Sequence, residues 1–183
     1  MKKLLMLSVL VATLGLTAAA ETPIKLSLYD NIAWPKTNHA NVVLGLVDAN
    51  TPTVHGISWV IGSSRADQMW GWSAAYGYAR SNEMRGLQGA IYNVTTDAVG
   101  LTGGILDVNK GTFTGLKTGL VNLGQEMKGV QWGFYNQAEN LTGLQLGFVN
   151  NARRVECGLQ IGLVNIIKEN GWLPVMVIVN GRF

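Results

Sequence analysis

Residues 143–165 read GLQLGFVNNARRVECGLQIGLVN, so one eight-residue phrase occurs twice with a short polar run between the copies. Similar units recur at a nearly constant interval and begin at Gly56, Gly71, Gly86, Gly100, Gly115, Gly129, Gly143 and Gly158. A weaker unit begins near Asn41. Because each copy of a repeat is one structural unit, this periodicity decides the fold.

Apolar and polar positions alternate within each unit. The second and sixth positions are always apolar, and the third is Ser, Thr, Lys or Gln. The fifth is glycine in five later units and Ala75 or Ala90 in two earlier ones, while the eighth is often Asn. Alternation at period two is typical of strands, and the short polar runs between units are typical of turns. The sequence therefore predicts an all-β fold with about ten to twelve strands.

Two architectures fit such units. In an up-and-down antiparallel β-barrel, each unit is one strand and one hairpin turn. In a β-solenoid, each unit is one coil, and the Asn and Gln positions stack as ladders. An eight-residue strand spans about 26 Å, so a coil closes only if the phrase breaks into sides of about five residues with a corner at positions six and seven. A barrel needs no return path, because one unit divides into a membrane strand and a tight turn.

Three features favour the barrel. Residues 71–81 place Trp72, Tyr76 and Tyr78 on one face of a strand, as in a lipid-facing row. Residues 168–171 predict a turn between two apolar strands, and the last strand ends on Phe183. A terminal Phe on an exported chain resembles the C-terminal assembly signal of bacterial outer-membrane barrels. Against the barrel, identical units in antiparallel strands would meet different surroundings, and long outer loops are missing. We expect the barrel and keep the solenoid as the alternative.

Residues 1–20 are typical of a secretory signal peptide, which leaves residues 21–183 as a single domain. Lys2 and Lys3 precede an apolar run at 4–16, and three alanines form the cleavage site. Without the leader, 12 basic residues face 11 acidic ones, so the charge gives no support to nucleic-acid binding. Charged residues are 14% of the chain, against about 25% in soluble domains. The lone Cys157 excludes an intramolecular disulfide.

The phrases GLQLGFVN, GLQIGLVN and GVQWGFYN, the opening IKLSLYDNIAWP and the ending GWLPVMVIVNGRF resemble an uncharacterised family of exported, surface repeat-containing bacterial proteins. The resemblance covers nearly all of the chain after the leader. It implies a location in the cell envelope and supplies no catalytic residues. Some members look like lipoproteins, from which this chain departs because no cysteine follows its leader.

Residues with reactive side chains form no known motif. His39 and His55 lack metal-ligand spacing, and Cys157 lies in no nucleophile elbow. The glycines match no phosphate-binding loop, and the recurring carboxylates match no calcium repeat: Asp97, Glu126, Glu139, Glu156 and Glu169. A tryptophan set could stack on sugars but is more typical of a lipid-facing girdle or a core: Trp59, Trp70, Trp72 and Trp132. We expect no enzymatic activity, no cofactor and no metal site.

These observations predict a non-enzymatic protein of the outer membrane or cell surface of a Gram-negative-type bacterium, with a structural, adhesive or narrow-pore role. Its expected partners are the lipid bilayer of the outer membrane and its assembly machinery, for which Phe183 is the candidate signal. The alternative is an exported β-solenoid that presents a polar face to a partner.

Overall fold

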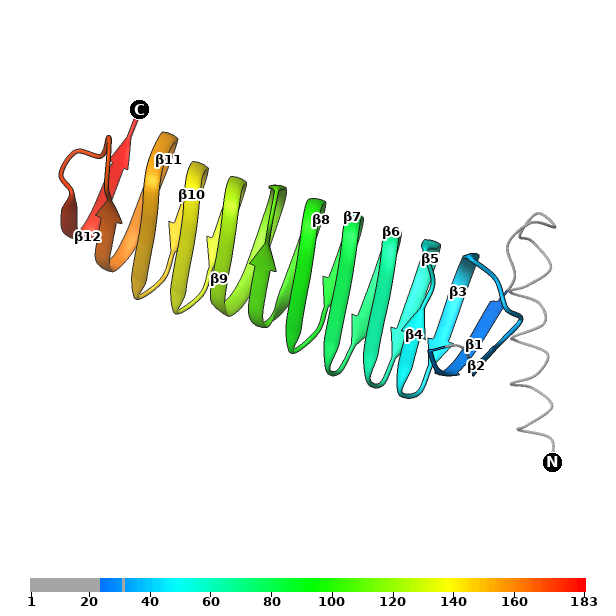
Figure 1. Cartoon of the computed structure of the whole chain (residues 1–183). Helices are drawn as coiled ribbons and strands as arrows, with labels where there is room; N and C mark the ends of the chain where they lie inside the picture. The colour runs from blue at the N-terminus through cyan, green and yellow to red at the C-terminus, as the bar shows by residue number, and fades with distance from the viewer. Residues whose placement is uncertain (1–23, 31) are drawn as a thin grey trace, which may run out of the picture.

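The computed structural model describes residues 24–30 and 32–183, in which every regular element is a β-strand. The strands stack into one elongated body with β1 and β2 at one end and β12 at the other (Figure 1). Their bounds are β1 Ile24–Tyr29, β2 Ile32–Trp34, β3 His39–Gly45, β4 Asp48–Asn50, β5 Thr53–Val60, β6 Ser63–Ala75, β7 Tyr78–Gly89, β8 Tyr92–Asn109, β9 Thr112–Trp132, β10 Tyr135–Leu146, β11 Val149–Ile167 and β12 Val175–Arg182. The predicted signal peptide at 1–20 lies outside the described residues.

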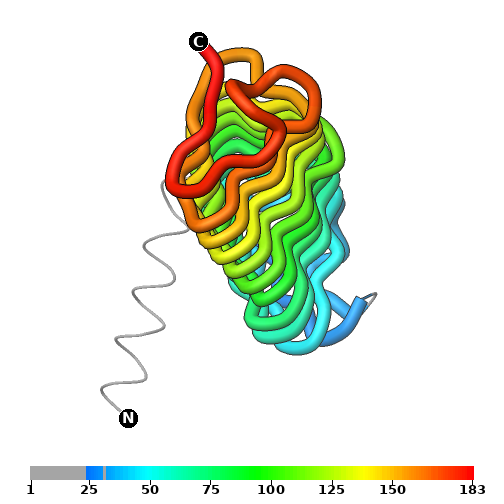
Figure 2. Tube along the Cα trace, turned by 90° about the vertical axis from the view of Figure 1, so that its left-hand side faces the viewer, coloured from blue at the N-terminus to red at the C-terminus, as the bar shows by residue number. Residues whose placement is uncertain are grey.

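The repeat units are coils of a β-solenoid of about nine turns. Neighbouring strands from β3 to β11 pair in parallel, and the unit glycines stand in register, as Gly86 does with Gly100 and Gly100 with Gly115. Figure 2 shows the flattened coils stacked behind one another. The all-β prediction is confirmed and the barrel is wrong, because parallel in-register pairing gives identical units identical surroundings, which antiparallel hairpins cannot do.

Each coil closes because the eight residues of the repeated phrase do not form one continuous strand. One corner falls near the fifth to seventh positions, where the strands are interrupted at 61–62, 76–77, 90–91, 133–134 and 147–148. The other corner falls at the unit glycine, whose φ lies between +128° and +149° in seven units. This backbone conformation is essentially restricted to glycine. Two short sides and two corners therefore fit within one unit, as the solenoid alternative requires.

Polar side chains fill one half of the interior as ladders. The third-position glutamines are fully buried, and Gln160 donates to Gln145 at 2.7 Å, which donates to Gln131 at 2.6 Å. The eighth-position asparagines form a second ladder, in which Asn122, Asn136 and Asn150 each donate to the next at 2.8–2.9 Å. These ladders confirm what the solenoid alternative predicts. They stabilise the stack because a buried amide must find a partner, and the next coil supplies an identical one.

The asparagine ladder also fixes the backbone at the corner near the fifth to seventh positions, here called the phrase corner. Asn150 Nδ2 lies within 3.5 Å of the Gly147 carbonyl oxygen in its own coil and donates at 2.9 Å to the Ile161 carbonyl in the next. Asn122 and Asn93 make the equivalent pairs of contacts. One asparagine per coil thus links the corner of its own coil to the next coil, where the accepting carbonyl also receives a backbone N–H, as Ile161 does from Gly147.

The other half of the interior is apolar. A column of large side chains runs along it, interrupted by the small Ala98 between Met84 and Phe113. Its members are Met69, Met84, Phe113, Met127, Leu141 and Val155. Alanines such as Ala138 and Ala152 lie beside the column and leave room for it. Burial of about one large apolar side chain per coil contributes about 1.5–3 kcal/mol each, so the stack is stabilised coil by coil.

Both ends of the parallel stack carry an antiparallel strand. β2 pairs with β1 at one end, and β12 pairs with β11 at the other. The predicted turn at 168–171 is confirmed between β11 and β12. Phe183 follows β12, is 79% exposed and lies 6.0 Å from the Trp172 ring. The interpretation of Phe183 as a barrel assembly signal depended on the barrel, so the solenoid removes its basis.

Candidate functional site: an exposed apolar face

One broad side of the solenoid is an apolar face formed by the second, fourth and sixth positions of the units. None of these positions carries a charged residue in the eight units. The sixth-position side chains are 48–64% exposed, from Ile61 to Tyr76. The face is built by alternation: each strand turns its polar third position inward and its apolar neighbours outward. Its most exposed members include Ile57, Trp59, Trp72, Leu87, Ile91, Leu120, Trp132, Phe134, Phe148 and Leu163.

The apolar face is larger than an ordinary surface patch. Sides of about five residues and a strand spacing of about 4.8 Å give eight coils an area of about 650 Å². The largest apolar patch on a typical soluble monomer covers about 300–600 Å², and larger ones mark sites of interaction with proteins or membranes. Phe134 and Phe148 stack at 4.8 Å on it, so aromatic rings follow the ladder outside as amides do inside.

The relief of the apolar face comes from its fourth positions. The large side chains of Trp59 and Trp132 project from the face, and between them lie the small residues Ala74, Gly89 and Gly103. A groove of about 760 Å³ adjoins Trp132 and is lined by Phe134, Phe148, Leu163, Ile178 and glycines of the corner. A second groove, of about 640 Å³, lies near Trp34 and Trp59 at the other end. Both are open and mostly apolar. Their polar lining residues are Ser27 and Lys36 in the groove near Trp34 and Thr118 in the groove beside Trp132, so neither has the several convergent polar groups that orient a small substrate.

The opposite side is a charged face, formed by the outward residues that follow the eighth position. Arg153 contacts Glu169 at 2.7 Å and Glu139 at 3.7 Å, and Arg154 contacts Glu156 at 3.3 Å. The Glu169 carboxylate raises the pKa of the Arg153 guanidinium by hydrogen bonding to it. These groups are about half exposed, and such pairs contribute little to stability. The solenoid is therefore amphipathic across its thickness: one broad side is apolar, and the opposite side is charged.

The residues considered for catalysis or metal binding do not form a site. The His39 and His55 rings meet edge to face at 4.9 Å, and His55 stacks on Trp70 at 4.4 Å. Within the described residues, no group of three or more His, Cys, Asp or Glu side chains could hold a metal ion. Cys157 is exposed in β11. The recurring carboxylates lie along the charged face, where Glu139, Glu156 and Glu169 form ion pairs with arginines. Asp97 and Glu126 instead accept hydrogen bonds from Thr112.

The tryptophans divide between two places. Trp59, Trp72 and Trp132 are exposed on the apolar face, as a girdle would be. Trp70 lies beside that face and has His55 stacked on its ring and the Arg85 guanidinium over it at 5.1 Å. Because these neighbours come from the coil before and the coil after, Trp70 has no free face for a sugar.

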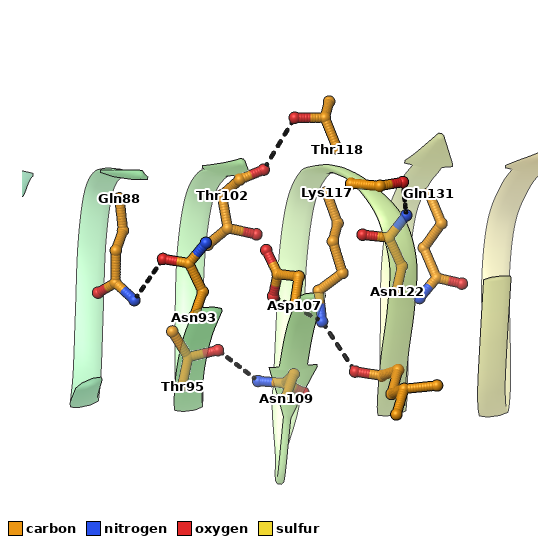
Figure 3. A network of polar contacts seen from close by, with 12 residues as sticks. Gln88, Asn93, Thr95, Thr102, Asp107, Asn109, Lys117, Thr118, Asn122 and Gln131 are labelled. Carbon is orange, nitrogen blue, oxygen red and sulfur yellow. Dashed lines mark hydrogen bonds and ion pairs between the residues drawn. The ribbon is translucent and has the colours of Figure 1, made fainter. Parts of the chain in front are cut away.

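One ion pair is sealed inside the solenoid. The Lys117 ammonium lies 3.3 Å from the Asp107 carboxylate, and both side chains are fully buried (Figure 3). Burial lowers the pKa of Lys117 and raises that of Asp107, and the attraction between the two groups opposes both shifts. Lys117 Nζ also donates to the Leu123 carbonyl at 3.0 Å, six residues on, as Gln160 does to Ile166. The pair replaces one Gln and one Asn of the ladders and cannot meet a substrate.

Comparison with known proteins adds no relative. No protein-family model, no curated protein and no solved structure matches the chain. The likeness to exported surface repeat proteins therefore stays a prediction.

No helix long and apolar enough to cross a bilayer occurs in the part of the chain that the structure describes.

Proposed function

We propose that this protein is an exported, non-enzymatic component of the cell envelope that attaches through its apolar face to the lipid surface of the outer membrane. The observation that carries this proposal is the continuous apolar face, which runs the length of eight coils without one charged position. Burial of such a face against lipid removes its area from water, while the charged face stays hydrated. Attachment of this kind fits a structural or adhesive role.

The margins of the apolar face support contact with an interface rather than with the bilayer centre. Tyr78 and Tyr92 lie at the phrase corner with ring centroids 5.4 Å apart, and Tyr135 occupies the same corner of a later coil. Tyrosine is enriched where one end of a side chain is apolar and the other is wet. The interior holds packed ladders and a packed core, so a pore role no longer has a basis.

Binding to lipid vesicles tests this function. Purified protein should float with phospholipid vesicles in a density gradient and should be monomeric without them. Phe148→Glu removes an exposed ring from the apolar face, and loss of about 1.5–3 kcal/mol of burial should lower the partition coefficient at least about tenfold.

Asn140→Glu is the matched control, because it adds the same charge at an exposed site on the charged face. The control should bind vesicles as the wild type does. A wild-type protein that stays in the aqueous fraction as a stable dimer would show that a second copy, and not lipid, covers the apolar face.

Export makes a separate prediction. Protein recovered from the envelope should begin at Glu21, since the leader at 1–20 is removed during translocation. Intact-mass measurement of the purified envelope fraction checks the cleavage site. A mass equal to the full 183-residue chain would contradict the signal-peptide prediction.

A further inference from the structure

A row of residues borders the apolar face along its glycine corner. This glycine flank consists of the residues that directly precede the unit glycines: His55, Trp70, Arg85, Val99, Thr114, Lys128, Thr142 and Cys157. Two of them are cations and none is a carboxylate. The carboxylates lie further round the coil, on the charged face. Where the apolar face meets water on this side, the fixed charge is therefore positive.

Arg85 is held in place by stacking. Its Cζ lies 5.1 Å from the centroid of the Trp70 ring, whose other neighbour, His55, is stacked at 4.4 Å with an interplanar angle of 8°. A guanidinium over an aromatic face keeps its N–H groups directed outward in its own plane. The stack therefore restricts the side chain and leaves its hydrogen-bond donors available.

Those donors have no partner within the protein. Arg85 is exposed, and it forms no ion pair or hydrogen bond with any residue in the described ranges, including Glu83 two residues before it. Arg153 and Arg154 on the charged face differ from Arg85, since both contact glutamates. A stacked, unpaired guanidinium presents a fork that matches the oxygens of a phosphate.

Lys128 adds a second cation three coils further along the same flank. It is exposed and forms no ion pair in the described part of the chain, although it shares a shallow polar hollow with Glu126 and Glu156. Three strand spacings separate the two cations by about 14 Å, which is enough for two different headgroups. Arg85 is the better placed of the two, because no carboxylate shares a hollow with it.

We propose that the glycine flank, with Arg85 as its principal residue, binds the phosphate headgroups of anionic lipids while the apolar face rests on the acyl region. This inference rests on the proposed attachment to lipid and names the class of lipid. Each cation near an anionic surface strengthens binding about fivefold, so headgroup recognition adds to apolar burial and also sets which edge of the solenoid points to the headgroups.

Vesicles of two compositions test the inference. One is wholly zwitterionic phosphatidylcholine, and the other includes phosphatidylglycerol as the anionic lipid. Wild-type protein should bind the anionic vesicles more strongly, and salt should reduce the difference. Arg85→Gln should reduce the preference about fivefold and should weaken binding to the zwitterionic vesicles much less, because the choline cation offsets the charge of their phosphate. Arg85→Lys should restore it only in part, because an ammonium lacks the planar fork.

Arg80→Gln is the matched control, because Arg80 is an exposed and unpaired arginine of the same strand that lies on the charged face. This variant should keep the full preference for anionic vesicles. Equal loss in the Arg80 and Arg85 variants would overturn the role of the flank and leave only net charge. Equal wild-type binding to both vesicle types would overturn the headgroup inference while the proposed attachment stands. Absence of binding to either type would overturn the proposed attachment itself.

Discussion

Replacement of Lys117 by glutamine should lower the free energy of unfolding by about 3–5 kcal/mol, although glutamine is the residue at this position in four other units. The reason is the partner that remains. Without the ammonium, the fully buried Asp107 carboxylate has no cation beside it to offset its charge. A buried unpaired charge costs far more than the contact that it has lost.

The double variant Asp107→Asn with Lys117→Gln should recover this loss and exceed the wild type. It gives the coil the asparagine and glutamine of its neighbours, so the Asn93 and Asn122 ladder and the Gln131 ladder can continue through it. Exchange of a buried ion pair for neutral groups is often neutral or stabilising by about 1–4 kcal/mol. Single and double variants together form a cycle that isolates the coupling between positions 107 and 117.

The pH dependence of the wild type follows from the two pKa directions. Burial raises the pKa of Asp107, so its ionised form costs stability once the pH exceeds the carboxyl's unfolded value of about 3.9. Burial lowers the pKa of Lys117, so its charged form costs stability below the unfolded value of about 10.4. Both costs apply near neutral pH, where the double variant should gain most.

Urea unfolding for the free energies and thermal unfolding for the melting temperatures, both followed by far-UV circular dichroism at pH 7, check these values. At about 2–4 °C per kcal/mol for a chain of this size, the Lys117→Gln variant should melt at least about 6 °C below the wild type. A single variant as stable as the wild type would mean that water reaches the pair. A double variant less stable than the wild type would show that the ion pair stabilises the fold relative to its neutral replacement.

The strand content and the two faces of each strand could be predicted because alternation is a local property. The outward apolar row and inward polar row follow from period two wherever the strand goes. Parallel or antiparallel pairing is not local, and the barrel prediction rested on an unbroken eight-residue strand, which is too long for one side of a coil. The corner near the fifth to seventh positions removes that objection, and the in-register glycines were the signal that favoured it.

The fifth position changes from alanine to glycine along the chain. The cause is the contact with the preceding coil, which local periodicity does not reveal. Ala75 and Ala90 fit because the preceding coils carry Ser64 and Ala79 at the ladder position. Asn93 begins the ladder, and Gly104 is the first fifth-position glycine. A Cβ on Gly104 would lie 2.7 Å from the Asn93 amide nitrogen and 2.0 Å from the Ala90 carbonyl oxygen. Each corner thus loses its side chain one coil after an asparagine needs the space.

The candidate site was predictable in one part only. Its apolar composition follows from the second and sixth positions, which the sequence shows to be apolar in every unit. The glycine flank was not predictable, since His55, Trp70 and Arg85 share no residue type and become neighbours only when successive units stack in register. Their common place, directly before a unit glycine, was the signal that could have found them.

Substitution of the unit glycine Gly129 by alanine should destabilise the solenoid by about 4 kcal/mol or more. Point substitutions reach this size only where a specific structural cause, such as backbone strain or a clash, is present. Its φ of +130° is strained for any residue with a side chain, at a cost of about 1–3 kcal/mol. The new Cβ would also lie 2.1 Å from the Gly115 carbonyl oxygen of the preceding coil. The atoms that the Cβ would meet are backbone atoms of Gly115, which no side-chain movement can relieve.

Gly89→Ala is the matched control for Gly129→Ala, because it makes the same chemical change inside a strand. A Cβ on Gly89 would meet only the Gly103 carbonyl oxygen, at 3.9 Å, and the methyl would join the apolar face. This variant should equal the wild type or gain about 0.4–1 kcal/mol from a less flexible unfolded chain. Thermal unfolding should separate the two variants by at least about 8 °C. Similar melting temperatures would mean that the coils can slide apart at the glycine corner, and the in-register stack of unit glycines would then not be what holds successive coils together.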